Sequence, residues 1–145
     1  HAWSFLARLK PLCQLVLFWG SIQTYPSLVD DYHLAQALTG HGCFRAYLHR
    51  MKKIQTPECD LCLAEAPDTA EHTLMECDYF TYERERMMAT TGWMAEPEQW
   101  TAAMLGCEDN WRAVENFVGC TLGTKENLER LRREHVSARA QEGGD

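Results

Sequence analysis

Apolar residues in the first third of the chain recur every three or four positions, which is the spacing of one face of an α-helix. The first set is Leu28, Tyr32, Ala35 and Leu38. Ser27 and Asp30 form a capping box that begins this helix, and Gly40 ends it. The adjacent acids Asp30 and Asp31 therefore fall in a first helical turn, where exposed amide groups favour negative charge. We interpret them as helix-start residues with no catalytic role.

A second helix is predicted after a hinge at His41 and Gly42. Its apolar stripe consists of Phe44, Tyr47, Leu48 and Met51, and its other face carries Arg45, Arg50, Lys52 and Lys53. Pro57 ends the helix, because proline lacks the amide hydrogen that a helix interior needs. Phe44 and Tyr47 could stack on nucleic-acid bases or pack in the core, and their helical spacing favours the core.

The helical pattern continues through the rest of the chain. Thr69 follows a turn at residues 66–68 and is placed to cap a helix that runs to about Thr90 and closes at Gly92. Further helices are predicted from Pro97 to Leu105, from Asn110 to Val118, and from a cap at Thr124 to about Ala140. The fold class predicted from this pattern is mainly α.

The first 25 residues differ from the rest of the chain. They are apolar and aromatic without a clean period, and they predict a helix over residues 3–19 that is interrupted near Pro11. The apolar run at residues 12–19 is too short to span a bilayer, so we expect no membrane partner. We divide the chain into an N-terminal apolar segment whose origin is open (1–25), a small helical domain (26–140) and a frayed tail (141–145).

Composition narrows the functional classes. The chain has 145 residues, 46% of them hydrophobic, and a net charge of −7, which argues against a general polyanion binder. Its seven cysteines lack the density and regular spacing of a secreted disulfide scaffold. We therefore expect a reducing, intracellular location, either nuclear or cytoplasmic.

Four residues carry the most specific chemical signal. Cys59, Cys62, His72 and Cys77 follow the spacing C-x2-C-x9-H-x4-C. Two thiols two residues apart can bind one ion from a single turn, and an imidazole and a third thiol can complete a tetrahedron. A complete set of four soft ligands predicts one structural zinc ion at residues 59–77. The alternative is that the thiols are ordinary core residues, but this segment is polar and offers little core.

A basic stretch precedes the first of these cysteines. Residues 41–57 contain no acid, and the candidate nucleic-acid-binding residues among them are Arg45, His49, Arg50, Lys52 and Lys53. A solvated helix face with no partner is an equally good interpretation of the basic stretch taken alone.

The string Leu-Thr-Gly-His-Gly-Cys-Phe-Arg-Ala-Tyr-Leu at residues 38–48, together with Cys59, Cys62, His72 and Cys77, resembles the C-terminal region of non-LTR retrotransposon reverse transcriptases. The resemblance covers roughly residues 26–135 and is greatest to the insect clade whose members insert into ribosomal RNA genes or telomeric repeats. It implies a parent polyprotein with endonuclease and reverse transcriptase domains, and a C-terminal CCHC zinc knuckle that holds template RNA or target DNA. Neither catalytic domain lies in this sequence, so we expect no enzymatic activity from it.

Three functions follow as hypotheses. The first is a nucleic-acid-binding accessory module in which zinc fixes the knuckle and the basic helix meets the phosphates of RNA or single-stranded DNA. The second is a docking module for another protein, for instance the polymerase domain of the parent polyprotein, which the acidic total supports. The third is an inert remnant of a decayed element, against which the intact ligand set argues.

Overall fold

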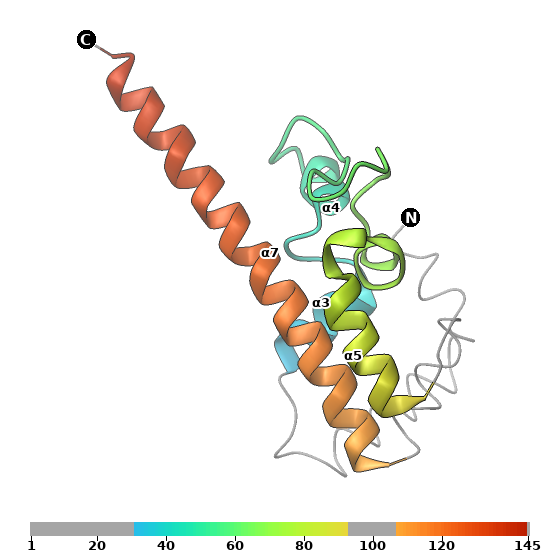
Figure 1. Ribbon diagram of the computed structural model, residues 1–145. Coiled ribbons are helices and arrows are strands. Elements are labelled where there is room, and N and C mark those ends of the chain that lie inside the picture. The colour runs from blue at the N-terminus through green and yellow to red at the C-terminus, as the bar shows by residue number, and fades with distance from the viewer. Residues whose placement is uncertain (1–30, 93–106, 145) are drawn as a thin grey trace.

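The computed structural model describes residues 31–92 and 107–144, and the shorter helices among them lie along one side of a long helix (Figure 1). The elements are α3 (Asp31–Thr39), α4 (Arg45–Arg50), the π-helical turn η1 (His72–Glu76), the 3-10 turn η2 (Asp78–Phe80), α5 (Thr81–Thr91) and α7 (Glu108–Glu142). Within these ranges there is no strand, and Glu58 and Pro67 form an isolated β-bridge. The mainly α prediction is confirmed. The predictions for residues 1–30 and for the helix at 97–105 lie outside the described residues.

The long helix α7 runs unbroken through 35 residues. The prediction of two helices separated near Thr124 is therefore wrong. The Thr124 hydroxyl donates a hydrogen bond to the Cys120 carbonyl at 2.9 Å, so it is satisfied inside a helix and does not cap a new one. Val118 and Leu122 continue one buried face across the expected break. In the described part of the chain, neither α7 nor any other helix combines the length and apolar character that crossing a membrane requires.

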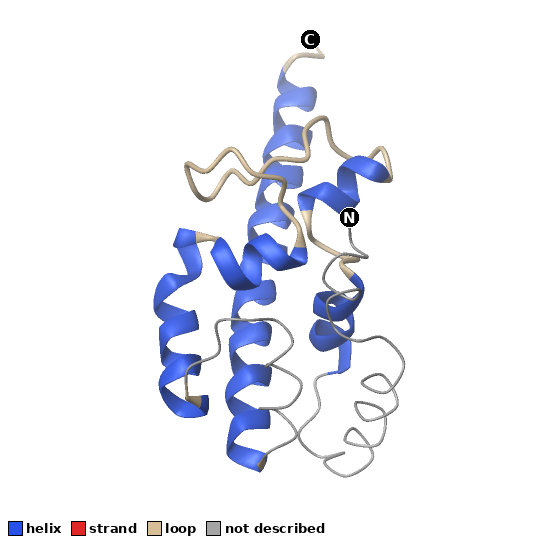
Figure 2. Cartoon of the chain, turned by 90° about the vertical axis from the view of Figure 1, so that its right-hand side faces the viewer, coloured by secondary structure: helices blue, strands red, loops and turns tan. Residues whose placement is uncertain are grey.

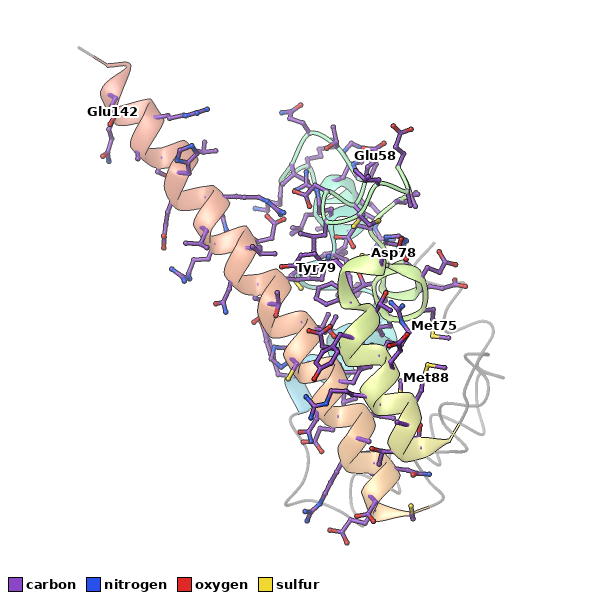
Figure 3. All side chains as sticks on the ribbon, in the orientation of Figure 1. Glu58, Met75, Asp78, Tyr79, Met88 and Glu142 are labelled. Carbon is purple, nitrogen blue, oxygen red and sulfur yellow. The ribbon has the colours of Figure 1, made fainter. Side chains whose placement is uncertain are left out.

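The hydrophobic core lies where α3 and α5 pack against α7 (Figures 1 and 2). Its largest buried side chains are Phe44, Leu74, Met87, Trp111, Val114, Phe117, Val118 and Leu122. Phe44 has no exposed surface, which confirms the core interpretation and removes it from the candidates for base stacking. Met75 from η1 and Met88 from α5 lie on one side of the molecule and pack against the edge of the core (Figure 3).

The connection between α3 and α4 is a tight turn, as the hinge prediction requires. The helix α3 ends at Gly40, which has a φ of 71°. Gly42 has a φ of 98°, and a Cβ there would lie 2.6 Å from the side chain of Gln36. The positive φ favours glycine at this position, and any other residue would also have to displace the Gln36 side chain.

The second predicted helix is shorter than its apolar stripe suggested. It ends at Arg50 and does not continue toward Pro57. The amide of Lys53 donates to the Leu48 carbonyl at 2.8 Å, and the amide of Lys52 donates to the His49 carbonyl at 2.9 Å. This pair of bonds is the pattern that ends many helices through a left-handed residue, usually glycine. Here that residue is Lys52, with a φ of 59°.

Candidate metal centre and basic turn

The four predicted ligands converge on one point. The ligand atoms of Cys59, Cys62, His72 and Cys77 all lie within 4.8 Å of one another. The three side chains of Cys59, His72 and Cys77 are buried, and that of Cys62 is half-buried. The structure thus brings together all four residues that the sequence spacing selected, and the cluster can hold one metal ion.

The spacing of the ligand atoms fits a tetrahedral ion. Metal–sulfur bonds of about 2.3 Å and metal–nitrogen bonds of about 2.0 Å place two sulfurs about 3.8 Å apart and sulfur about 3.5 Å from nitrogen. Cys59 Sγ lies 3.8 Å from Cys77 Sγ, and Cys62 Sγ lies 3.3 Å from His72 Nε2. A disulfide needs about 2.0 Å between sulfurs, so the two thiols are separate groups at coordination distance.

A small backbone frame holds the first two ligands. The amide of Cys59 donates to the Ala66 carbonyl at 2.8 Å, and the amide of Asp68 donates to the Pro57 carbonyl at 2.8 Å. These two bonds close the loop that contains Cys62. The loop is exposed at its tip, where Leu63 is fully accessible, while Leu61 and Cys62 pack against the small buried cluster of Cys59, Cys77 and Phe80.

The other two ligands are positioned by a break in a helix. The Thr69 hydroxyl accepts a hydrogen bond from the His72 amide at 3.1 Å, which confirms the predicted cap. The single helix expected from there to Thr90 is interrupted at Cys77, whose backbone is extended. Arg84 stabilises this break, because it donates to the Leu74 carbonyl at 2.8 Å and to the Cys77 carbonyl at 2.9 Å, which also accepts from the Phe80 amide. The break directs Cys77 toward Cys59.

Charged groups surround the cluster. The Nδ1 atom of His72 lies 3.6 Å from a Glu76 carboxylate oxygen, so Nε2 is left to face the cysteines. Burial raises the pKa of the Cys77 thiol to about 12, so the thiol is protonated at neutral pH and an ion must displace its proton to bind. Burial lowers the pKa of the Arg84 guanidinium, which lies against the Cys77 carbonyl.

A buried ion pair connects the cluster region to α7. Asp68 has no exposed surface, and its carboxylate accepts hydrogen bonds from Lys125 Nζ at 2.6 Å, from the Arg45 amide at 3.0 Å and from the Thr73 hydroxyl at 2.8 Å. Lys125 is 5% exposed. One carboxylate therefore links α4, the turn before η1, and α7.

A second set of ion pairs lies closer to the exposed end of α7. Arg45 donates to Glu129 at 3.2 Å and to the Glu58 carbonyl, next to the first cysteine, at 3.0 Å. Arg132 forms ion pairs with Glu129 and with Asp60 of the cysteine loop. The loop that carries Cys59 and Cys62 is thus attached to α7 by charge.

The five predicted nucleic-acid-binding residues do not share one environment. Arg45 has all three guanidinium nitrogens engaged, the last with the Thr56 hydroxyl at 3.2 Å. His49, Arg50, Lys52 and Lys53 are exposed. Arg50 lies over the Tyr47 ring at 5.4 Å. We call the exposed segment of residues 49–53 the basic turn, and Arg45 is a structural anchor beneath it.

Sequence reasoning missed the residues that position the site. Asp68, Lys125, Glu129 and Arg84 were not selected, because charged residues are usually exposed and carry no periodic signal when they are buried. The partners Asp68 and Lys125 are 57 residues apart in the chain. One signal could have identified the pair. Lys125 continues the buried helix face of Val118, Thr121 and Leu122, and a lysine on such a face indicates a buried acidic partner.

Comparison with known proteins gives one distant similarity. Over 99 residues, 26% of positions are identical to the retrovirus-related Pol polyprotein from type-1 retrotransposable element R1 4 of Nasonia vitripennis, a match that covers 68% of this chain. The chain spans about a quarter of the length of that polyprotein. No protein-family model and no solved structure matches. The chain is therefore related at a distance to a region of a retrotransposon Pol polyprotein, in line with the resemblance that its motifs indicated.

Proposed function

We propose that this chain is a nucleic-acid-binding accessory module in which one zinc ion holds the basic turn against template RNA or single-stranded target DNA. The observation that carries the proposal is the attachment of the basic turn to the ligand cluster. Arg45 of α4 donates to the carbonyl of Glu58, the residue before Cys59, and α4 leads directly into the basic turn.

Zinc is the ion that these ligands favour. Three thiolates and one imidazole in a tetrahedron are typical of structural zinc sites, and the set leaves no position for a reacting water. When bound, zinc supplies folding free energy to the cysteine loop and to η1. The hydrogen bonds and ion pairs of Asp68, Arg45 and Arg132 then connect the cysteine loop to α4 and α7.

The basic turn has two properties that suit a phosphate-binding element. Four cationic or potentially cationic side chains are exposed there, and the surrounding residues 41–57 contain no acid. Lys52 also occupies a left-handed position that glycine normally fills, which costs about 1 kcal/mol or more. A residue kept at a conformational cost where glycine would be easier is expected at a functional position.

The experiment is a salt titration of single-stranded RNA affinity. Fluorescence anisotropy with a labelled oligonucleotide would compare the full metal-loaded chain with the triple variant Arg50→Gln, Lys52→Gln, Lys53→Gln. Each phosphate contact releases counterions and adds about −0.7 to the slope of log affinity against log salt, so the variant should lose about two units of slope.

The control variant removes three exposed arginines elsewhere, Arg86, Arg112 and Arg130, and so makes the same change in net charge. It should bind with a slope close to that of the parent chain. A triple variant of the basic turn with the affinity and slope of this control would favour the second candidate function, docking onto the polymerase domain or another protein. The net charge of −7 is the observation that favours that alternative.

A further inference from the structure

A cavity of about 420 Å³ opens between α3, the basic turn and the second half of α7. Residues that line it include Tyr32, Gln36, Lys53, Glu126, Glu129 and Arg133. We propose that this cavity receives one unstacked base of a bound single strand, while Lys53 and Arg133 hold the neighbouring phosphates at its mouth. The inference rests on the proposed function and names the subsite that would read the bound nucleic acid.

The volume of the cavity is suitable for one nucleotide. Small-ligand sites in proteins enclose about 300 to 1,000 Å³, and the cavity at about 420 Å³ lies in the lower part of that range. Its wall also contains apolar groups, among them Leu48 and Ile54, that can contact the face of a base. Proteins that bind single strands commonly accept extruded bases in such sites.

Two cations from distant parts of the chain meet at this cavity. Lys53 belongs to the basic turn and Arg133 to α7. The Nε atom of Arg133 donates to the Glu129 carbonyl at 3.4 Å, and within residues 31–92 and 107–144 its two terminal nitrogens have no partner. Both Lys53 and Arg133 are exposed, so each can contact a phosphate without first breaking an ion pair within the described chain. The cavity therefore has a cation from the basic turn, Lys53, on one side and a cation from α7, Arg133, on the other.

An aromatic ring stands at the same opening. Tyr32 is 62% exposed, and its ring lies 5.2 Å from that of His33 at an interplanar angle of 60°. The Tyr32 side chain is therefore largely open to solvent and lines the same cavity as Lys53 and Arg133. Stacking of a base on such a ring contributes about 1–3 kcal/mol and tolerates any base.

The floor of the cavity is acidic, which decides what can enter it. Glu129 is neutralised by Arg45 and Arg132, whereas Glu126 has one oxygen 3.3 Å from His33 Nε2 and another that is buried without a hydrogen-bond partner in the described part of the chain. Glu126 forms no ion pair with a lysine or arginine in the described part of the chain, so its carboxylate repels phosphate and can accept a hydrogen bond from an amino group. Cytosine and adenine carry such amino groups and uracil does not, so the cavity should favour cytosine or adenine over uracil.

The test uses fluorescence anisotropy of labelled 12-nucleotide homopolymers of cytosine, adenine and uracil with the full metal-loaded chain. Two variants remove the cavity groups, Tyr32→Ala and Arg133→Gln. Two matched controls remove an equally exposed tyrosine and an exposed arginine outside the cavity, Tyr82→Ala on α5 and Arg112→Gln in the first turns of α7.

We expect Tyr32→Ala to weaken binding to the cytosine strand about tenfold. Arg133→Gln should reduce the salt slope by about 0.7. Both controls should bind like the parent, and the uracil strand should bind more weakly than the cytosine strand.

The inference and the proposed function fail in different ways. Cavity variants that bind like their controls, in a protein whose affinity still depends on Arg50 and Lys52, would overturn the cavity and leave the proposed function standing. A parent chain that binds none of the three strands would overturn both. Equal affinities for cytosine and uracil strands would overturn the assignment of the acidic floor.

Discussion

Replacing Asp68 with asparagine should destabilise the whole protein, because it leaves a buried ammonium group without a counter-charge. Asp68 has no exposed surface and Lys125 is 5% exposed, with 2.6 Å between the carboxylate oxygen and Nζ. Among residues 31–92 and 107–144, the other favourable contact of this ammonium is with the Phe44 ring, whose centroid is 5.9 Å away. Water cannot replace the lost carboxylate at a site this enclosed.

The expected magnitude follows from the burial of both partners. Removing one member of a buried ion pair typically costs about 3–5 kcal/mol, which is a large share of a total stability of about 5–15 kcal/mol. Lys125→Met should cost less, about 2 kcal/mol, because Asp68 keeps the hydrogen bonds from the Arg45 amide and the Thr73 hydroxyl. The double variant should be more stable than Asp68→Asn alone, since it removes the orphaned charge.

The assay is urea denaturation of the full chain at saturating zinc, followed by far-ultraviolet circular dichroism. Free energies of unfolding from linear extrapolation would be compared for the parent, the two single variants and the double variant. A coupling energy of about 1–3 kcal/mol is expected for the pair. A cost below about 1 kcal/mol for Asp68→Asn, or strictly additive costs in the double variant, would refute the reasoning that this pair joins the ligand cluster to α7.

Three further predictions address the helix, the knuckle and a buried thiol. Gly123→Ala should stabilise the protein by about 0.5–1 kcal/mol in the same denaturation assay, because Gly123 lies inside α7 and a Cβ there meets no atom within 4 Å. A destabilised variant would contradict a continuous helix. Cys59→Ser should abolish amide-exchange protection over residues 57–80 while α7 stays protected, since zinc contributes about 10 kcal/mol in small modules; unchanged protection there would count against the site. Burial raises the pKa of the Cys43 thiol from its ordinary 9.0 to about 12. Between pH 9 and pH 12 the unfolded chain therefore loses a proton that the folded chain keeps, and the free energy of unfolding should fall as the pH rises. A Cys43→Ala variant with the same decline would show that other groups cause it.

The sequence was most informative where structure depends on local spacing. The ligand set could be recognised because two turns and a helix start place Cys59, Cys62, His72 and Cys77 together, whatever the rest of the fold does. The helix ends at Gly40 and Gly92 and the cap at Thr69 were predicted for the same reason, because backbone conformation and capping are decided within a few residues.

Features that depend on contacts between distant segments were not predictable. The sequence predicted the end of one helix at Val118 and the start of another at Thr124, yet the buried face of α7 continues across Gly119 and Gly123 because α3 and α5 pack on it. Tertiary packing here outweighs weak helix propensity. The break at Cys77 likewise depends on Arg84, whose hydrogen bonds replace those of an unbroken helix.

The charged residues divide in a way that sequence alone could not reveal. Arg45 and Arg50 both belong to the basic face of one predicted helix, but Arg45 is held by Glu129 and two backbone or hydroxyl oxygens while Arg50 is exposed. The two arginines differ because Glu129 of α7, which is distant from both in the chain, lies beside Arg45 and not beside Arg50. Arg133 could not be associated with Lys53 for the same reason.

The central claim is that Cys59, Cys62, His72 and Cys77 hold one zinc ion that fixes the fold beside the basic turn. The most direct measurement is the metal content, by elemental analysis, of the full chain purified under reducing conditions, with Cys59→Ser prepared in parallel. The account predicts one zinc per parent chain and a loss of bound zinc in the variant. A parent chain that is folded and free of metal would contradict it.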